Sequence, residues 1–227
     1  MKKFKIAIQG ELGAYSHIAA NELFQSAEIK TCATFEETFK QAYEDENCKI
    51  IIPIENSLAG RVADIHYLLP KYKLQIHGEY FLNVEHNLLC KPEATIKDIK
   101  YVRSHAQAIG QCQKLINNHK FQSIISADTA GSAKDLSEGS DKSIAAIASN
   151  LSATIYKLKI LEKNIEDEKG NVTRFLVMGK NIEQPEFHEK KKFITSCIFR
   201  LKSEPSALYK CLGGFATNQV NLTKLES

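Results

Sequence analysis

Short runs rich in isoleucine and valine alternate with amphipathic stretches from the N-terminus to about residue 178. This alternation is typical of βαβ units around a mainly parallel sheet, so the sequence predicts an α/β fold. We expect strands at residues 4–9, 29–33, 49–54, 73–77, 80–90, 101–103, 123–127, 143–148 and 172–178, with helices between most of them.

Capping residues mark several helix boundaries. Thr34 and Ser104 each stand three residues before a glutamate or glutamine, which fits a capping box. Asp128 precedes another helical stretch and is a favourable N-cap. Pro70 predicts the end of a helix that begins near Gly60, because proline cannot donate a backbone hydrogen bond.

The chain changes character after residue 179. Residues 180–192 are polar and charged, which is typical of a linker. Beyond them we expect a strand at 193–201, a helix that opens at 203–205 and a second strand at 219–225. These residues are too few to build a core of their own, so this piece must pack on another surface or belong to a larger domain.

Composition excludes several classes of function. The net charge is only +3, from 30 basic and 27 acidic residues, so no broad positive field predicts a nucleic-acid partner. The six cysteines are scattered, without metal-ligand spacing, and read as reduced thiols. No secretory signal or membrane span is evident, and we expect a cytoplasmic protein with no metal or organic cofactor.

Polar side chains gather where predicted strands end. Glu55, Asn56 and Ser57 follow a buried strand, and such strand ends are where α/β folds bind ligands. Ser104, Gln107 and Gln111 follow another strand and share one helix face. A helix cap with surface glutamines explains the second group equally well. The lone histidines, including His17 and His86, show no partner at catalytic spacing and are expected to be structural.

Residues 170–175 read G-N-V-T-R-F, which places a hydroxyl and a guanidinium side by side on a short strand. Neighbours on a strand point to opposite faces, so Thr173 and Arg174 could share a ligand only if the strand ends or bends there. Gly170 makes a bend plausible. The alternative is an ordinary β-forming threonine beside an exposed arginine.

Together, P-I-E-N-S-L-A-G-R-V, S-H-A-Q-A-I-G-Q-C and N-V-T-R-F, in this order, resemble the prephenate dehydratase family over nearly the whole chain. The resemblance implies a two-lobed, periplasmic-binding-protein-like (type II) α/β catalytic domain over residues 1–179, with the active site between the lobes. Lobe one would hold about 1–78 and 159–179, and lobe two about 79–158.

The resemblance also implies roles for individual residues. Prephenate would lose its ring hydroxyl as water and its ring carboxylate as carbon dioxide. Thr173 would be the catalytic hydroxyl, with the proton coming from water or from a relay that includes Glu55. Arg174 would bind a substrate carboxylate, and neutral hydrogen bonds would come from Asn56, Ser57, Ser104, Gln107 and Gln111. Two alternatives stay open: arogenate as the substrate, or a non-catalytic two-lobed module that binds a small carboxylate or amino acid.

By the same resemblance, residues 193–227 are the first part of an ACT regulatory domain, a ferredoxin-like α+β unit that binds L-phenylalanine at a dimer interface. Its G-A-L motif appears with serine in place of glycine before Ala207 and Leu208, and its E-S-R-P motif survives as Glu226 and Ser227. The second half of that domain is not in this sequence, which implies either a truncated chain or a protein that has lost feedback control, and both alternatives put allosteric regulation in doubt. A homodimer or homotetramer is implied.

Overall fold

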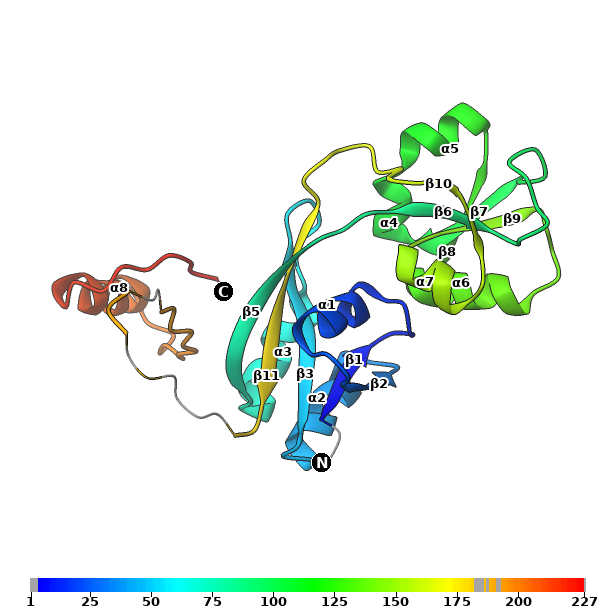
Figure 1. Cartoon of the computed structure of the whole chain (residues 1–227). Coiled ribbons are helices and arrows are strands. Elements are labelled where there is room, and N and C mark those ends of the chain that lie inside the picture. The colour runs from blue at the N-terminus through cyan, green and yellow to red at the C-terminus, as the bar shows by residue number, and fades with distance from the viewer. Residues whose placement is uncertain (1–3, 182–185, 187, 191–192, 227) are drawn as a thin grey trace. The chain divides into compact units, whose positions relative to one another are not determined.

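A computed structural model describes residues 4–181, 186, 188–190 and 193–226. The chain divides into two compact units, Met1–Pro185 and Glu186–Ser227. The first unit holds two lobes, each built on one β-sheet (Figure 1). None of the helices in the described residues has the length and hydrophobicity needed to traverse a bilayer.

The sheet of lobe one has the order β2-β1-β3-β11-β5, with β4 paired to β3. Strand β1 runs parallel to β2 and β3, whereas β11 returns from the far end of the domain and runs antiparallel between β3 and β5. The strands are β1 (Lys5–Gln9), β2 (Glu28–Cys32), β3 (Cys48–Asn56), β4 (Gly60–Arg61), β5 (Gln75–Asn83) and β11 (Val172–Gly179).

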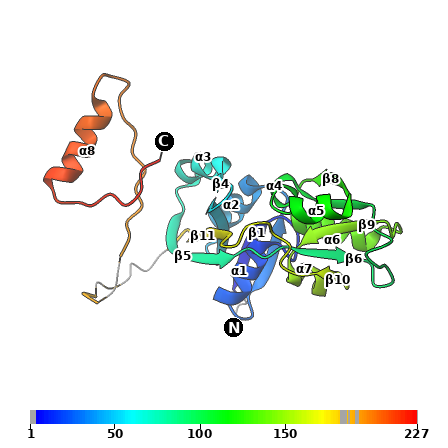
Figure 2. The ribbon, with the colours of Figure 1, turned by 90° about the horizontal axis from the view of Figure 1, so that it is seen from above.

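Helices cover both faces of this sheet. Helix α1 (Tyr15–Leu23) packs on one face, and α2 (Phe35–Glu44) and α3 (Ala63–Tyr72) pack on the other (Figure 2). Successive strand residues point to opposite faces, so Ile51 faces α1 while Ile50 and Ile52 face α2 and α3. Burial on both sides explains why β3 reads as a continuous apolar run.

Lobe two has the sheet order β10-β6-β9-β7-β8. Its strands are β6 (Asn87–Cys90), β7 (Tyr101–His105), β8 (Gln122–Ser126), β9 (Ile144–Ala148) and β10 (Lys159–Glu162). Helices α4 (Ala106–Gly110) and α5 (Gln113–His119) contribute to one apolar cluster, and α6 (Thr129–Glu138) and α7 (Asn150–Ile155) to another. The expected two-lobed α/β fold is confirmed.

The chain crosses between the lobes at residues 84–86 and 163–171, later than the boundaries expected at 78 and 158. Gly78 does not end a strand, because β5 passes through it with a shift of register opposite Val177 and Met178. The return is late because β10 pairs with β6 of lobe two. The two crossing segments are hydrogen-bonded to each other, from Val84 N to Asn171 O at 2.7 Å and from Ile165 N to His86 O at 2.9 Å.

Two of the predicted helix caps form as expected. Thr34 accepts from Glu37 N, and Asp128 accepts from Gly131 N at 2.6 Å. The prediction for Pro70 was wrong: α3 continues through it to Tyr72 and ends where Lys73 adopts a left-handed φ of 50°. Because the helix stops within a turn of the proline, little helix follows the interruption.

The second unit differs from its prediction. Its described residues hold one helix, α8 (Ala207–Thr217), and neither 193–201 nor 219–225 forms a strand. A strand needs a partner for its backbone hydrogen bonds, and within this piece none is in place. Apolar side chains such as Ile194, Ile198 and Tyr209 are exposed by 64%, 64% and 80%. Ser227 and much of the expected linker lie outside the described residues.

Candidate active site at the lobe crossing

The ends of β3 and β11 bring Asn56 opposite Thr173. Thr173 is 8% exposed, and its Oγ1 accepts a hydrogen bond from Asn56 Nδ2 at 2.9 Å. Among the described residues no other group hydrogen-bonds to this hydroxyl, so its own proton remains available to a ligand.

The orientation of the Asn56 amide is fixed by the backbone. Asn56 Oδ1 accepts from Leu58 N at 3.0 Å and from Ala59 N at 2.8 Å, so the other end of the amide must be the NH2 group. That group donates to Thr173 Oγ1 and, at 2.6 Å, to Asn171 Oδ1. The direction of every hydrogen bond at this point therefore follows from two backbone N–H groups.

The direction of the hydrogen bonds that is set at Asn56 continues across the lobe boundary. Because Asn171 Oδ1 accepts, Asn171 Nδ2 donates, and it reaches Gln111 Oε1 at 2.9 Å. His86 Nε2 lies 2.8 Å from the same Gln111 oxygen, and His86 Nδ1 lies 2.8 Å from the Tyr15 hydroxyl. We call these six residues the site network: Tyr15, Asn56, His86, Gln111, Asn171 and Thr173.

Two side-chain groups of the site network donate no hydrogen bond to the described part of the chain. The Gln111 carbonyl oxygen receives both its hydrogen bonds within the network, and among the described residues nothing hydrogen-bonds to its NH2 group. The Thr173 hydroxyl proton is the second. Both are neutral donors, and the Gln111 carboxamide is held in place before any ligand binds. Donors positioned in advance favour developing negative charge.

Burial keeps the histidine and tyrosine of the network uncharged. His86 is 3% exposed, and burial lowers its pKa, only partly opposed by the contact with Gln111 and by Glu166. Burial also raises the pKa of Tyr15, and nearby Cys112, Glu166 and Glu85 add to the effect. The network is therefore a chain of neutral hydrogen bonds at neutral pH.

Arg174 points into a separate cluster. Its NH1 lies 3.3 Å from Glu55 Oε1, its NH2 lies 2.7 Å from Glu79 Oε2, and its guanidinium carbon lies 5.9 Å from the centre of the Phe81 ring. Thr173 and Arg174 are neighbours on β11, so their side chains leave opposite faces, as the partners of each show. In the contacts that the structure records, Glu55 is paired with Arg174 and not with Thr173.

The three other predicted binding residues have different surroundings. Ser57 Oγ donates to Gly170 O at 2.9 Å and accepts from Val172 N at 2.9 Å, so it holds the segment that leads into Thr173. Gln107 is exposed on α4. Ser104 is fully buried within β7, and its hydroxyl donates to Ile147 O at 2.7 Å.

The prediction that Ser104 binds substrate is therefore corrected, because its side chain points into the core of lobe two. Its predicted role as a helix cap was also wrong: His105 caps α4 by accepting from Gln107 N. The strand continues to His105, two residues further than expected, which carries Ser104 into the sheet.

Asn171, His86 and Tyr15 were not among the predicted site residues. Asn171 stands two positions before Thr173, and residues two apart on a strand share one face. The sequence could therefore have predicted that Asn171 lies beside Thr173. His86 and Tyr15 carry no such signal. His86 meets Gln111, and Tyr15 meets His86, only because folding brings residues 15, 86 and 111 together.

The loop at residues 10–14 of lobe one makes direct contacts with lobe two. Gly13 O accepts from Ser149 Oγ at 2.6 Å and from Ser152 Oγ at 3.0 Å, and Lys134 Nζ lies 3.0 Å from Glu11 Oε1. A Cβ on Gly13 would lie 2.4 Å from Ser152 Oγ, and its φ is +93°. The glycine turn thus serves close contact between lobes.

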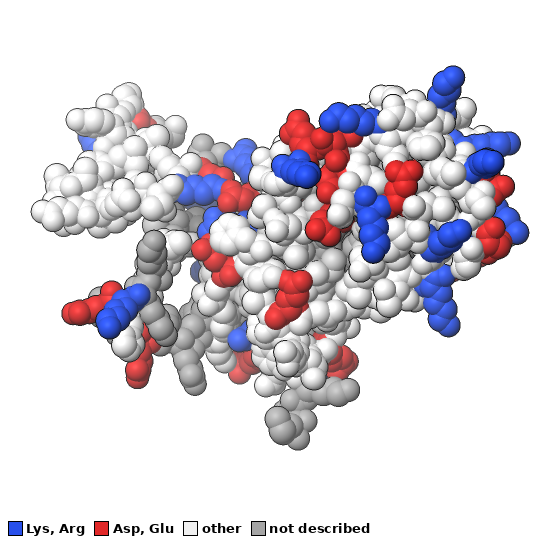
Figure 3. Space-filling model, turned by 45° about the horizontal axis from the view of Figure 1, so that its top comes forward, with Lys and Arg blue, Asp and Glu red and all other residues white. Residues whose placement is uncertain are grey.

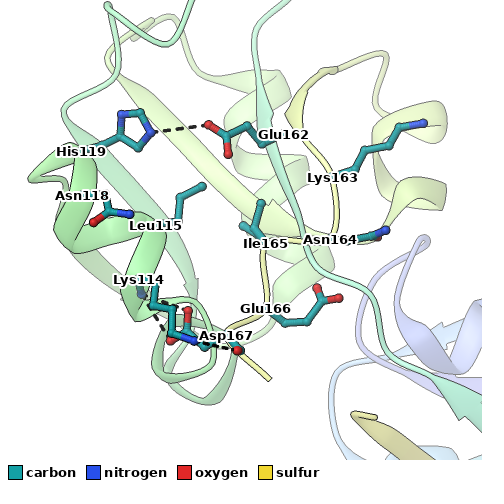
Figure 4. Close-up of a pocket in the computed structure, with 10 residues that line it drawn as sticks. All are labelled: Lys114, Leu115, Asn118, His119, Glu162, Lys163, Asn164, Ile165, Glu166 and Asp167. Atoms are coloured by element: carbon teal, nitrogen blue, oxygen red, sulfur yellow. Dashed lines mark hydrogen bonds and ion pairs between the residues drawn. The ribbon is translucent and has the colours of Figure 1, made fainter. Parts of the chain in front are cut away.

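Two hollows lie elsewhere on the first unit. One, of about 370 Å³, lies in lobe two beside α5 and the second crossing segment, and is lined by residues such as Lys114, His119 and Glu162 (Figure 4). The other, of about 580 Å³, lies between α1, β5 and α7 and reaches Tyr15. Neither is lined by Thr173. Figure 3 shows acidic and basic side chains interspersed on the visible face, with no dominant basic patch.

A family model for prephenate dehydratase matches residues 6–183. The chain is 39% identical over 225 residues to a bifunctional N-acyl-homoserine lactone acylase/prephenate dehydratase of Komagataeibacter europaeus, covering 98% of this chain and 79% of the relative. It is 40% identical over 225 residues to the chloroplastic arogenate dehydratase/prephenate dehydratase 1 of Arabidopsis thaliana, covering 99% of this chain and 57% of the relative.

Among solved structures, the prephenate dehydratase of Arthrobacter aurescens in complex with L-phenylalanine superimposes with a TM-score of 0.86 at 25% identity. The match covers 98% of this chain and 74% of that one. The chain therefore spans between about half and four fifths of the length of these relatives.

Proposed function

Because this chain belongs to the prephenate dehydratase family, we propose that the site network is its active site and that it converts prephenate to phenylpyruvate, water and carbon dioxide. The observation that carries the proposal is the Thr173 hydroxyl, which accepts from an amide of fixed direction and keeps its own proton to donate. Family membership gives the reaction class, a carbon–oxygen lyase.

The reaction needs one proton and no redox partner. The bond from the ring to the hydroxyl breaks with its electron pair on oxygen, and a proton completes the leaving water. The bond from the ring to the carboxylate breaks with its pair in the ring, which becomes aromatic, and carbon dioxide departs. Prephenate dianion and one proton thus give phenylpyruvate anion, carbon dioxide and water.

Thr173 would donate its hydrogen bond to the departing hydroxyl. Threonine is a weak acid, so the amide hydrogen bond that its oxygen receives from Asn56 matters: it stabilises negative charge on Oγ1 as the proton moves outward. Assistance of this kind contributes about two to four powers of ten in rate. Water replaces the proton, since the carboxylate of Glu55 is held by Arg174.

One substrate carboxylate would be bound by the Gln111 NH2 group. Arg174 leaves the opposite face of β11 from Thr173, so it would bind the second carboxylate only after turning away from its present cluster. A guanidinium suits a carboxylate because it offers two parallel N–H donors. Arg174 already has two carboxylate partners, Glu55 and Glu79, so a substrate carboxylate would have to replace one of them. Asn56 and Ser57 support the site without meeting the ligand, and Gln107 stays a candidate for contact.

Two alternatives stay open. The substrate is arogenate in the first, and the protein is a non-catalytic binding module in the second. Both are separated by incubating the purified chain with prephenate and with arogenate while following phenylpyruvate and phenylalanine. We expect phenylpyruvate from prephenate at a kcat at least ten times that for arogenate. Phenylalanine from arogenate alone would assign the other substrate. Binding of either compound without any product would indicate a binding module.

The second unit is proposed to be the first part of an ACT domain, with Ala207, Leu208 and Glu226 in a partial site for L-phenylalanine. Support comes from the S-A-L sequence at the start of α8 and from the exposed apolar side chains, which suit a partner surface in a homodimer or homotetramer. For the 227-residue chain assayed by itself, in which α8 is the one regular element among the described residues of this unit, we expect weak inhibition by phenylalanine. Strong inhibition at low concentration would show that these residues suffice for binding.

A further inference from the structure

Hydrogen-bond direction in the site network is fixed at the Asn56 end by two backbone N–H groups. At the Gln111 end it is held by two side chains. At the Asn56 end, Leu58 N and Ala59 N permit one amide orientation only. At the far end, the Gln111 carboxamide is held by His86 and Asn171, which both reach its Oε1. If this carboxamide turned over, its oxygen would replace the NH2 group that the proposed function assigns to the substrate.

His86 can donate to Gln111 in one of its neutral forms only. Gln111 Oε1 is an acceptor, so the imidazole proton must lie on Nε2, and Nδ1 must then accept. The group that faces Nδ1 is the Tyr15 hydroxyl at 2.8 Å, which can supply a proton to it. The same hydroxyl lies 2.8 Å from Glu85 O, a carbonyl that can only accept, so His86 Nδ1 and Glu85 O compete for its single proton.

The pair is built into the lobe crossing. His86 lies on the first crossing segment, where its backbone N donates to Glu166 Oε2 at 3.0 Å and its carbonyl accepts from Ile165 N on the second. Tyr15 begins α1 of lobe one, and its ring stacks edge-on against His86 with centroids 5.7 Å apart. Elements of both lobes therefore hold the imidazole in place.

We propose that Tyr15 and His86 are a positioning pair: in its Nε2–H form His86 gives Gln111 Oε1 a second donor beside Asn171, and so holds the carboxamide in the orientation that turns its NH2 group toward the substrate. The inference rests on the proposed function only for what the NH2 group binds. Neither residue touches the reacting atoms; both act through Gln111.

Two substitutions at His86 separate positioning from structural support. In His86→Gln the new amide nitrogen reaches the region of Nε2 and keeps a donor for Gln111. In His86→Asn the shorter amide stays near Tyr15 and offers Gln111 nothing. Both replace the ring with a neutral amide, so they are matched. We expect His86→Asn to raise KM for prephenate about tenfold, and His86→Gln to restore most of that loss.

The decisive measurement is a double-mutant cycle with Gln111→Ala. If His86 acts through Gln111, His86→Asn will change KM in the wild-type background and leave it unchanged in the Gln111→Ala background. Equal factors in both backgrounds would mean that His86 only supports the fold, and would overturn the proposal.

A second measurement needs no turnover, so it stays separate from the outcome of the prephenate and arogenate assays. ¹⁵N NMR of histidine in the ligand-free chain at neutral pH should show His86 with its proton on Nε2. A proton on Nδ1 would contradict the pair. Tyr15→Phe should allow a mixture of both forms and raise KM by a smaller factor than His86→Asn does. An unchanged ¹⁵N spectrum of His86 in that variant would remove Tyr15 from the role.

Discussion

Asn56 Nδ2 donates to Thr173 Oγ1 across 2.9 Å, although 117 positions separate the two residues along the chain. The whole of lobe two is inserted between them. Their contact exists because β11 returns to pair with the end of β3. The catalytic assignment depends on this pairing, and the predictions below test it and its surroundings.

Removing only the Thr173 hydroxyl should abolish most turnover. Thr173→Val keeps the shape of the side chain but loses the donor, so we expect kcat to fall by about 10²–10⁴ with KM within about threefold of wild type. Thr173→Ser keeps a hydroxyl and should stay within about tenfold. Steady-state kinetics with melting temperatures as the folding control would decide, and a valine variant with near wild-type kcat would remove Thr173 from the mechanism.

If Arg174 binds a carboxylate of the substrate, then the carboxylates of Glu55 and Glu79 compete with the substrate for its guanidinium. Glu79→Gln removes one competitor and should lower KM by about two- to fivefold. Arg174→Lys loses the planar pair of donors and should raise KM markedly at similar stability. The measurement is KM for prephenate in each variant. Unchanged kinetics in Arg174→Lys would show that another group binds the carboxylate.

Close contact between the lobes at Gly13 should be sensitive to one methyl group. Gly13 and Gly10 share a φ of +93°, so alanine strains the backbone equally at both positions. A Cβ at Gly10 meets only ordinary contacts at 3.9 and 4.0 Å, whereas at Gly13 it would lie 2.8 Å from Ser152 Cα.

We therefore expect Gly10→Ala to cost about 1 kcal/mol of unfolding free energy and Gly13→Ala at least about 1 kcal/mol more. Urea unfolding of both variants measures the difference, in which the shared backbone strain cancels. Equal losses would mean that the loop moves aside without disturbing the lobe contact.

Stability should fall in mild acid because of buried histidines. Burial lowers the pKa of His17 from its ordinary 6.5, and its Nδ1 accepts from Gly13 N at 3.0 Å, a bond that protonation abolishes. The unfolded chain therefore binds more protons as pH falls below 6.5, so the unfolding free energy decreases in that direction. The pKa of His86 and that of His77 are also lowered by burial, with the same sign.

His17→Asn offers an acceptor that does not titrate in this range. Between about pH 7.5 and pH 5.5 we expect its unfolding free energy to fall less steeply than that of the wild type. Urea unfolding across this range is the measurement. Parallel slopes would show that the other histidines account for the whole effect.

Local patterns predicted most elements of the first unit. The apolar run at residues 49–54 became β3, and Asp128 became a helix cap, because both depend on the nearest neighbours in sequence. The predictions were wrong where a residue distant in sequence determines the local structure. Ser104 reads as a cap, yet β7 extends past it, and its hydroxyl bonds to Ile147 of the adjacent strand. In the second unit, strands at 193–201 and 219–225 lack the partner that strands require.

The sequence by itself determined the α/β class, the polar strand ends that hold Asn56 and Gln111, and a threonine–arginine pair on a strand, because side-chain periodicity and capping are local properties. Only the tertiary structure decided that Asn171, His86 and Tyr15 complete the site network and that Arg174 faces Glu55 and Glu79. Hydrogen-bond direction is set by which atoms meet across the lobe crossing, and residues distant in sequence meet there only after both sheets have formed.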